Sequence, residues 1–138
     1  MIMYLTFGDF YDDGHGKFKI VFVRGENPGA VRDAEKKLRE QYPNFYMAED
    51  YEDCSFSEDV WQAIETSGYP IWRFAEKDEN HNWEGVNGWD EIKEYNSFYD
   101  IDVMIDIYIW LLNDFGAGIE RVELQHALDT NVGYGYFY

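Results

Sequence analysis

Cysteine is nearly absent from this chain of 138 residues, since Cys54 is the only one. A single thiol excludes a disulfide framework and a cysteine-rich zinc site within one chain. The most apolar run, residues 101–112, is shorter than the ~20 apolar residues that a membrane-spanning helix needs and contains two aspartates. The first nine residues lack the basic region of a signal peptide. We therefore expect a cytoplasmic protein with no membrane partner, located in the host cytoplasm if a phage encodes it.

Basic residues are also scarce, with 11 lysines and arginines against 28 acids and a net charge of −17. Residues 1–42 hold seven residues of each sign, so the whole excess lies in residues 43–138, where four basic residues stand against twenty-one acids. This composition argues against direct binding of nucleic acid, because phosphate contacts need lysine and arginine. It favours a basic protein as the partner.

Aromatic side chains are abundant, at 20% of the chain. This share excludes a disordered acidic protein, and the length suits one domain over residues 1–138 with a sizeable core. Four of the last five residues are aromatic. We expect them either to add a strand to a sheet or to dock on a partner, which could be a second copy of the chain.

Local signals predict alternating strands and helices. Asp-Gly within residues 12–16 marks a hairpin turn, and Phe18, Ile20 and Phe22 are expected to face inward on the strand after it. Asn27-Pro28 begins a helix that Pro43 ends, and Ser57 begins another that Gly68 ends. The remaining expectations are strands over 44–51, 69–74 and 119–124, a loop over 75–88 and a short helix from Trp89 to Tyr95.

The apolar run at 101–112 has two interpretations. In a helix, Asp102, Asp106 and Asn113 form one polar stripe on an otherwise buried cylinder. In a strand, the odd positions from Ile101 to Leu111 form an unbroken apolar face. We favour the helix, because the run extends to a glycine stop at Gly116 and matches an average helix length.

The element order predicts an α+β fold: a single compact domain with a mainly antiparallel sheet and helices packed on one face. The helix at 101–115 is the candidate to lie across that sheet. No linker or internal repeat divides the chain.

Recognisable catalytic motifs are lacking, so we expect no catalytic residue, no cofactor and no metal ion. Cys54 lies among carboxylates, which disfavour a reactive thiolate. The loop Asp78-x-Asn80-x-Asn82-x-Glu84 matches a calcium loop only in part, because Trp83 occupies the glycine position. The alternative is a small metal-binding protein or enzyme that uses Asp102, Asp106 and His126, since two carboxylates one helical turn apart are a common metal-binding arrangement.

The distributed acids are the remaining candidate for function. Carboxylates with interleaved aromatic rings can occupy a protein surface that normally holds phosphates. The expected partner-binding residues are Glu49, Asp50, Glu52, Asp53, Glu58, Asp59, Asp78, Glu79, Trp83, Glu84, Asp90, Glu91, Asp102 and Asp106.

The leading hypothesis is a non-enzymatic acidic inhibitor that blocks a basic nucleic-acid-handling protein, such as a nuclease or defence effector, by DNA mimicry. Anti-restriction and anti-CRISPR inhibitors of phages and plasmids share this compact, acidic, aromatic and nearly cysteine-free composition, although no motif is shared. One alternative is an immunity protein that neutralises a nuclease toxin. Another is that the acids only keep the protein soluble.

Overall fold

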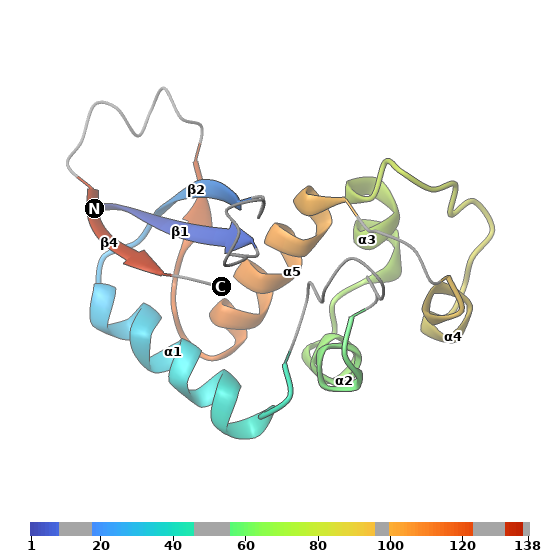
Figure 1. Ribbon diagram of the computed structural model, residues 1–138, viewed down its shortest axis with the longest axis horizontal. Helices are drawn as coiled ribbons and strands as arrows, with labels where there is room; N and C mark the ends of the chain where they lie inside the picture. Colours follow the sequence, from blue (N-terminus) through green and yellow to red (C-terminus); the bar gives the residue numbers. More distant parts are fainter. Residues whose placement is uncertain (9–17, 46–55, 96–99, 123–131, 137–138) are drawn as a thin grey trace, which may run out of the picture. The chain divides into compact units, whose positions relative to one another are not determined.

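The structure is a computed structural model that describes residues 1–8, 18–45, 56–95, 100–122 and 132–136. The chain forms two compact units, each described below by itself: unit 1, residues 1–38 and 112–138, and unit 2, residues 39–111. The elements in Figure 1 are β1 (Ile2–Gly8), β2 (Phe18–Arg24), α1 (Pro28–Gln41), α2 (Glu58–Ser67), α3 (Ile71–Lys77), α4 (Trp89–Lys93), α5 (Ile101–Asp114), β3 (Glu120–Arg121) and β4 (Val132–Tyr136).

Unit 1 contains a four-stranded sheet in the order β3-β2-β1-β4. The pairs β1–β2 and β2–β3 are antiparallel, whereas β4 runs parallel to β1, beside which it lies in Figure 1. The prediction of an α+β fold with a mainly antiparallel sheet is therefore confirmed. The aromatic C-terminal segment contributes a strand, which is the first of the two alternatives considered for it. The hairpin turn at 12–16 lies outside the described residues.

The predicted inward face of β2 is wrong. Val21 and Val23 are 2% and 0% exposed, whereas Ile20 is 47% exposed. In the β1–β2 register Val21 pairs with Leu5 and Val23 with Met3. All four of these side chains are buried and apolar. Both faces of β2 carry apolar residues, so alternation separates the two faces but does not identify the one that meets the core.

Helix α1 begins as predicted, because Asn27 Oδ1 accepts the Gly29 N–H at 2.9 Å and Pro28 opens the helix. Helix α2 begins at Ser57, whose side chain accepts the Val60 N–H at 3.4 Å, and ends at Gly68 in the left-handed conformation. The helical interpretation of 101–112 is confirmed as α5, and the short helix after residue 88 is confirmed as α4. No helix in the described ranges is long and apolar enough to cross a membrane.

The strand predicted over 69–74 is wrong, because this segment enters α3. The carbonyl of Pro70 accepts the N–H groups of Arg73 and Phe74 and so begins the helix. A six-residue apolar run does not distinguish strand from helix by periodicity, and proline is compatible with a helix start. The predicted loop consequently begins at Asp78 rather than at residue 75. Within the described residues, the strand predicted over 119–124 covers only Glu120–Arg121, as β3, and Asn44 and Phe45 are not in a strand. Residues 123 and 124 and the rest of 44–51 lie outside the described residues.

Candidate functional site

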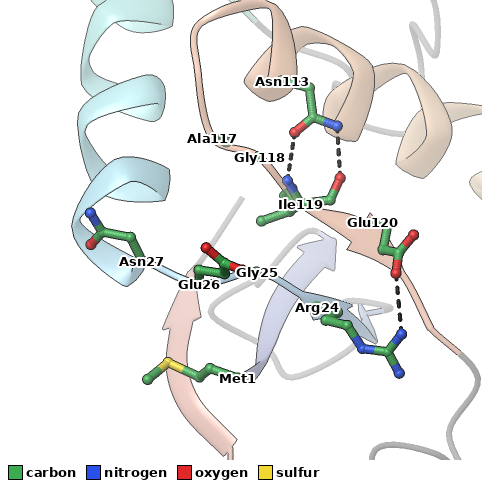
Figure 2. Close-up of a pocket in the computed structure, with 10 residues that line it drawn as sticks. All are labelled: Met1, Arg24, Gly25, Glu26, Asn27, Asn113, Ala117, Gly118, Ile119 and Glu120. Atoms are coloured by element: carbon green, nitrogen blue, oxygen red, sulfur yellow. Dashed lines mark hydrogen bonds and ion pairs between the residues drawn. The ribbon is translucent and has the colours of Figure 1, made fainter.

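Unit 1 contains an open pocket of about 630 Å³ (Figure 2). Its lining comes from the end of β2, the start of α1, the turn after α5 and the start of β3: Met1, Arg24, Gly25, Glu26, Asn27, Asn113, Ala117, Gly118, Ile119 and Glu120. None of these lining residues is a histidine, cysteine, serine or threonine, so the described lining offers no nucleophile or imidazole base.

The polar groups of this pocket mostly bind the protein itself. Arg24 pairs with Glu120 at 3.2 Å, and both side chains are more than half exposed. The amide of Asn113 donates to the carbonyl of Ile119 and accepts its N–H, both at 2.8 Å, as the dashed lines in Figure 2 show. These interactions shape the turn between α5 and β3, and we assign the pocket a structural role.

Replacing Asn113 by alanine should lower the free energy of unfolding by about 1–2 kcal/mol, because the Ile119 backbone loses two hydrogen bonds. Denaturant unfolding followed by circular dichroism measures this loss. Asp114→Ala, one residue further along α5 at an exposed position, is the control and should change stability by less than about 0.5 kcal/mol. Equal effects of the two changes would contradict the role given to Asn113.

Unit 2 is the acidic part of the molecule. It holds eighteen acids and four basic residues, a net charge of −14. Between residues 56 and 95 every exposed charged residue is an acid: Glu58, Glu65, Glu76, Glu79, Glu84, Asp90, Glu91 and Glu94. The basic residues of the same stretch, Arg73, Lys77 and Lys93, are only half-buried. The described surface of this stretch therefore presents mainly carboxylates to a partner, with three half-buried cations among them.

Two cations of this stretch contact acids, Lys93 at the surface and Arg73 at the half-buried Asp106. Lys93 lies 3.3 Å from Glu65 and 4.0 Å from Asp90, and its ammonium lies over the Trp61 ring. Arg73 pairs with Asp106 through two hydrogen bonds of 2.6 Å. Lys93 therefore partly neutralises Glu65 and Asp90, whereas the described ion pair of Arg73 is with Asp106 and with none of the eight exposed acids.

Asp78 is fully buried and organises the segment after α3. Its carboxylate accepts hydrogen bonds from the Trp83 indole at 2.9 Å and from the backbone N–H of Asp100 at 2.9 Å. His81 Nδ1 lies 2.8 Å from the same carboxylate. The side-chain carboxylate of Asp100 in turn accepts the backbone N–H of Glu79 at 3.0 Å. These bonds join the loop after α3 to the start of α5.

Asp106 is held by Arg73 and by the hydroxyl of Tyr69, which donates at 2.6 Å. Burial by itself raises the pKa of the Asp106 carboxyl, but the hydrogen bonds from Arg73 and Tyr69 and the charges of Arg73 and Lys77 outweigh it, so the net pKa is lowered. Burial and the hydrogen bond to Asp106 raise the pKa of Tyr69. The carboxylate therefore stays ionised and is bound within the protein.

The predicted partner-binding residues fall into four groups. Glu58, Glu79, Glu84, Asp90 and Glu91 are exposed; Asp59 and Asp102 are half-buried, and Asp59 accepts the Asn44 N–H at 2.8 Å. The prediction that Asp78, Trp83 and Asp106 face a partner is wrong. Asp78 and Trp83 are 0% and 5% exposed, and Asp106 binds Arg73 and Tyr69. Glu49, Asp50, Glu52 and Asp53 lie outside the described residues.

The alternative metal site has only two of its three residues within the described ranges, since His126 lies outside them. Asp106 is already bound by a guanidinium, which competes with a cation for the same oxygens. The described residues form no group of three histidine, cysteine, aspartate or glutamate side chains placed to hold a metal ion.

Trp72 is a surface residue that the sequence reasoning did not single out. It is 65% exposed on α3, and α3 was predicted to be a strand. Glu65, Glu76 and Glu94 are further exposed acids, and they are not among the predicted partner-binding residues. A solvent-facing tryptophan among carboxylates is a recognisable signal for an interface, but only once the helix shows which way it faces. Comparison of the chain with models of protein families, with curated proteins and with solved structures gives no match.

Proposed function

We propose that this protein is a non-enzymatic inhibitor that binds a basic, nucleic-acid-handling protein through the acidic surface of unit 2. The carboxylates would lie against the lysine and arginine side chains that otherwise contact phosphates, so the inhibitor and the nucleic acid compete for one surface. Opposite potentials would speed the encounter and orient the two proteins.

The observation that carries this proposal is the one-sided charge of the surface between residues 56 and 95. Eight exposed acids lie there, whereas the three basic residues of the same stretch are half-buried. A surface that serves solubility alone usually mixes both signs of charge. Exposed amides and aromatic rings lie among the acids, including Asn80, Asn82 and Tyr95, and they provide neutral contact area.

Rigid internal bonds favour binding by this surface. Asp78 ties the loop after α3 to the start of α5, and Arg73 ties α3 to Asp106. The exposed acids on α3, α4 and the connecting loop are therefore attached to a backbone that is already ordered. A pre-ordered surface loses less entropy on binding than a mobile chain does.

Affinity capture from the native host, or from cells that carry candidate defence systems, tests the proposal. The immobilised protein should retain a basic nucleic-acid-binding protein, identified by mass spectrometry, and the complex should weaken about tenfold or more between low and high salt. Added duplex DNA should displace the inhibitor from the same site. Recovery of no such protein, or a complex insensitive to salt, would overturn the proposal.

The proposal also predicts that affinity depends on where the acids lie and not only on how many there are. The variant Asp90→Asn, Glu91→Gln, Glu94→Gln removes three exposed acids around α4 of unit 2. We expect its affinity for the captured protein to fall about tenfold or more, mainly through slower association. The matched control Glu26→Gln, Asp33→Asn, Asp114→Asn removes three exposed acids of unit 1 and should change affinity less than about threefold. Calorimetry or surface-based kinetics measures both; equal losses would show that only total charge matters.

A further inference from the structure

Unit 2 contains a half-buried arginine site built from two residues of one helix. Asp106 and Trp110 are four residues apart on α5 and therefore share a face. The Arg73 guanidinium donates two hydrogen bonds to the Asp106 carboxylate, and its Cζ lies 5.4 Å from the centre of the Trp110 ring. Carboxylate and indole together hold this guanidinium.

Helix α3 carries the same two kinds of side chain on its outer face. Trp72 and Glu76 are also four residues apart, and both are exposed. Throughout the described part of the chain, neither takes part in a hydrogen bond, an ion pair or a ring contact. The two side-chain types that hold Arg73 thus also occur together on the surface of unit 2, in the reverse order along the helix and without a described occupant.

The backbone of α3 is fixed from its other side. Phe74 is fully buried, and the T-shaped contacts of its ring with Trp83 and Trp89 hold it. Arg73 is bound to Asp106, and the next residue after the helix is the buried Asp78. Trp72 and Glu76 therefore project from a helix that does not need to rearrange, which lowers the cost of using them in binding.

We infer that Trp72 and Glu76 form an anchor for an arginine side chain of a basic partner protein. The guanidinium stacks on the Trp72 indole while the Glu76 carboxylate accepts its N–H donors. Arginine suits this pair better than lysine, because its planar group is weakly hydrated and can stack and donate at once. The charge of −14 on unit 2 favours a cationic occupant. This inference rests on the proposed function and names the side chain that the surface selects.

Binding of two short peptides tests the anchor. Tetra-arginine and tetra-lysine with blocked ends carry equal charge and are titrated into the ¹⁵N-labelled full chain, with the Trp72 indole signal assigned from Trp72→Phe. We expect tetra-arginine to bind more tightly than tetra-lysine and to shift the Trp72 signal. Trp72→Ala and Glu76→Gln should each weaken tetra-arginine binding about threefold to fivefold. The control Asp33→Asn, which removes an exposed acid of unit 1, should weaken it less than about twofold.

The outcomes separate the anchor from the proposed function. If both peptides bind equally well, and neither Trp72→Ala nor Glu76→Gln changes their affinity, the anchor is wrong while an acidic binding surface remains. If neither peptide binds even at low salt, both the acidic surface and the anchor are wrong. Glu76→Gln keeps the indole and alters only an exposed side chain, so it tests the anchor without a risk to folding.

Discussion

Alanine at position 78 is expected to lower the free energy of unfolding by about 3–4 kcal/mol, the largest effect of any single change considered. Asp78 is fully buried, and its removal leaves the Trp83 indole N–H and the Asp100 backbone N–H without their acceptor. His81 also loses its carboxylate partner. Unpaired buried donors cost more than the bonds contribute when they are formed, because the groups remain desolvated. Urea unfolding followed by tryptophan fluorescence measures the loss.

Two further variants test whether the loss of stability comes from the hydrogen bonds of Asp78. Asp78→Asn should fall between the wild type and alanine, because the amide keeps one acceptor oxygen but places an N–H₂ group against donors. Asp90→Ala, at a side chain that is 98% exposed, should change stability by less than about 0.5 kcal/mol. If the alanine changes at positions 78 and 90 had equal effects, the buried network would have no part in stability.

Replacing Asp106 by alanine should cost about 2–3 kcal/mol. The Tyr69 hydroxyl, on a residue only 2% exposed, would lose its acceptor, and Arg73 would lose its bidentate partner. The effect is smaller than at Asp78, because 35% of the Arg73 side chain is exposed and water can solvate the freed charge. A double-mutant cycle with Arg73→Met isolates the pair, and additive losses would show that it contributes no coupling.

The same residue predicts a pH dependence. The pKa of the Asp106 carboxyl is lowered in the folded state, so its stabilisation is complete above the ordinary value of 3.8 and is lost as the pH falls through the lower folded value. The stability difference between wild type and Asp106→Asn should therefore be constant near neutral pH and shrink below about pH 4. Taking the difference between wild type and Asp106→Asn removes the contribution of the other acids to the pH dependence of stability. A difference that grew on acidification would contradict the assigned role.

The interior roles of Asp78 and Asp106 could not be predicted from local patterns. Asp78 binds the backbone of Asp100, twenty-two residues away, and Asp106 binds Arg73 on α3 and Tyr69 just before that helix. A carboxylate in a polar loop, or one turn from another carboxylate on a helix, looks the same in sequence whether it faces water or a partner side chain. Both residues were accordingly predicted to belong to the acidic surface.

The orientation of Trp72 could not be predicted, because the segment 69–74, predicted as a strand, in fact enters α3. In a strand over 69–74, Trp72 and Phe74 would lie on the same face, since side chains alternate with a period of two. In α3 they diverge: Phe74 is fully buried and Trp72 is 65% exposed. The helix also brings Trp72 and Glu76 to one face, and the proposed arginine anchor depends on this pairing.

Local sequence signals predict the start of α1, both ends of α2 and the C-terminal end of α5, because proline, capping side chains and glycine act on the nearest few peptide groups. The amino-acid sequence by itself also determined the uneven charge, which needs only counting. Tertiary structure decided which face of β2 is buried, that residues 71–77 form a helix, and which carboxylates are bound internally. Burial and hydrogen-bond partners come from residues distant in the chain, and only folding brings these together.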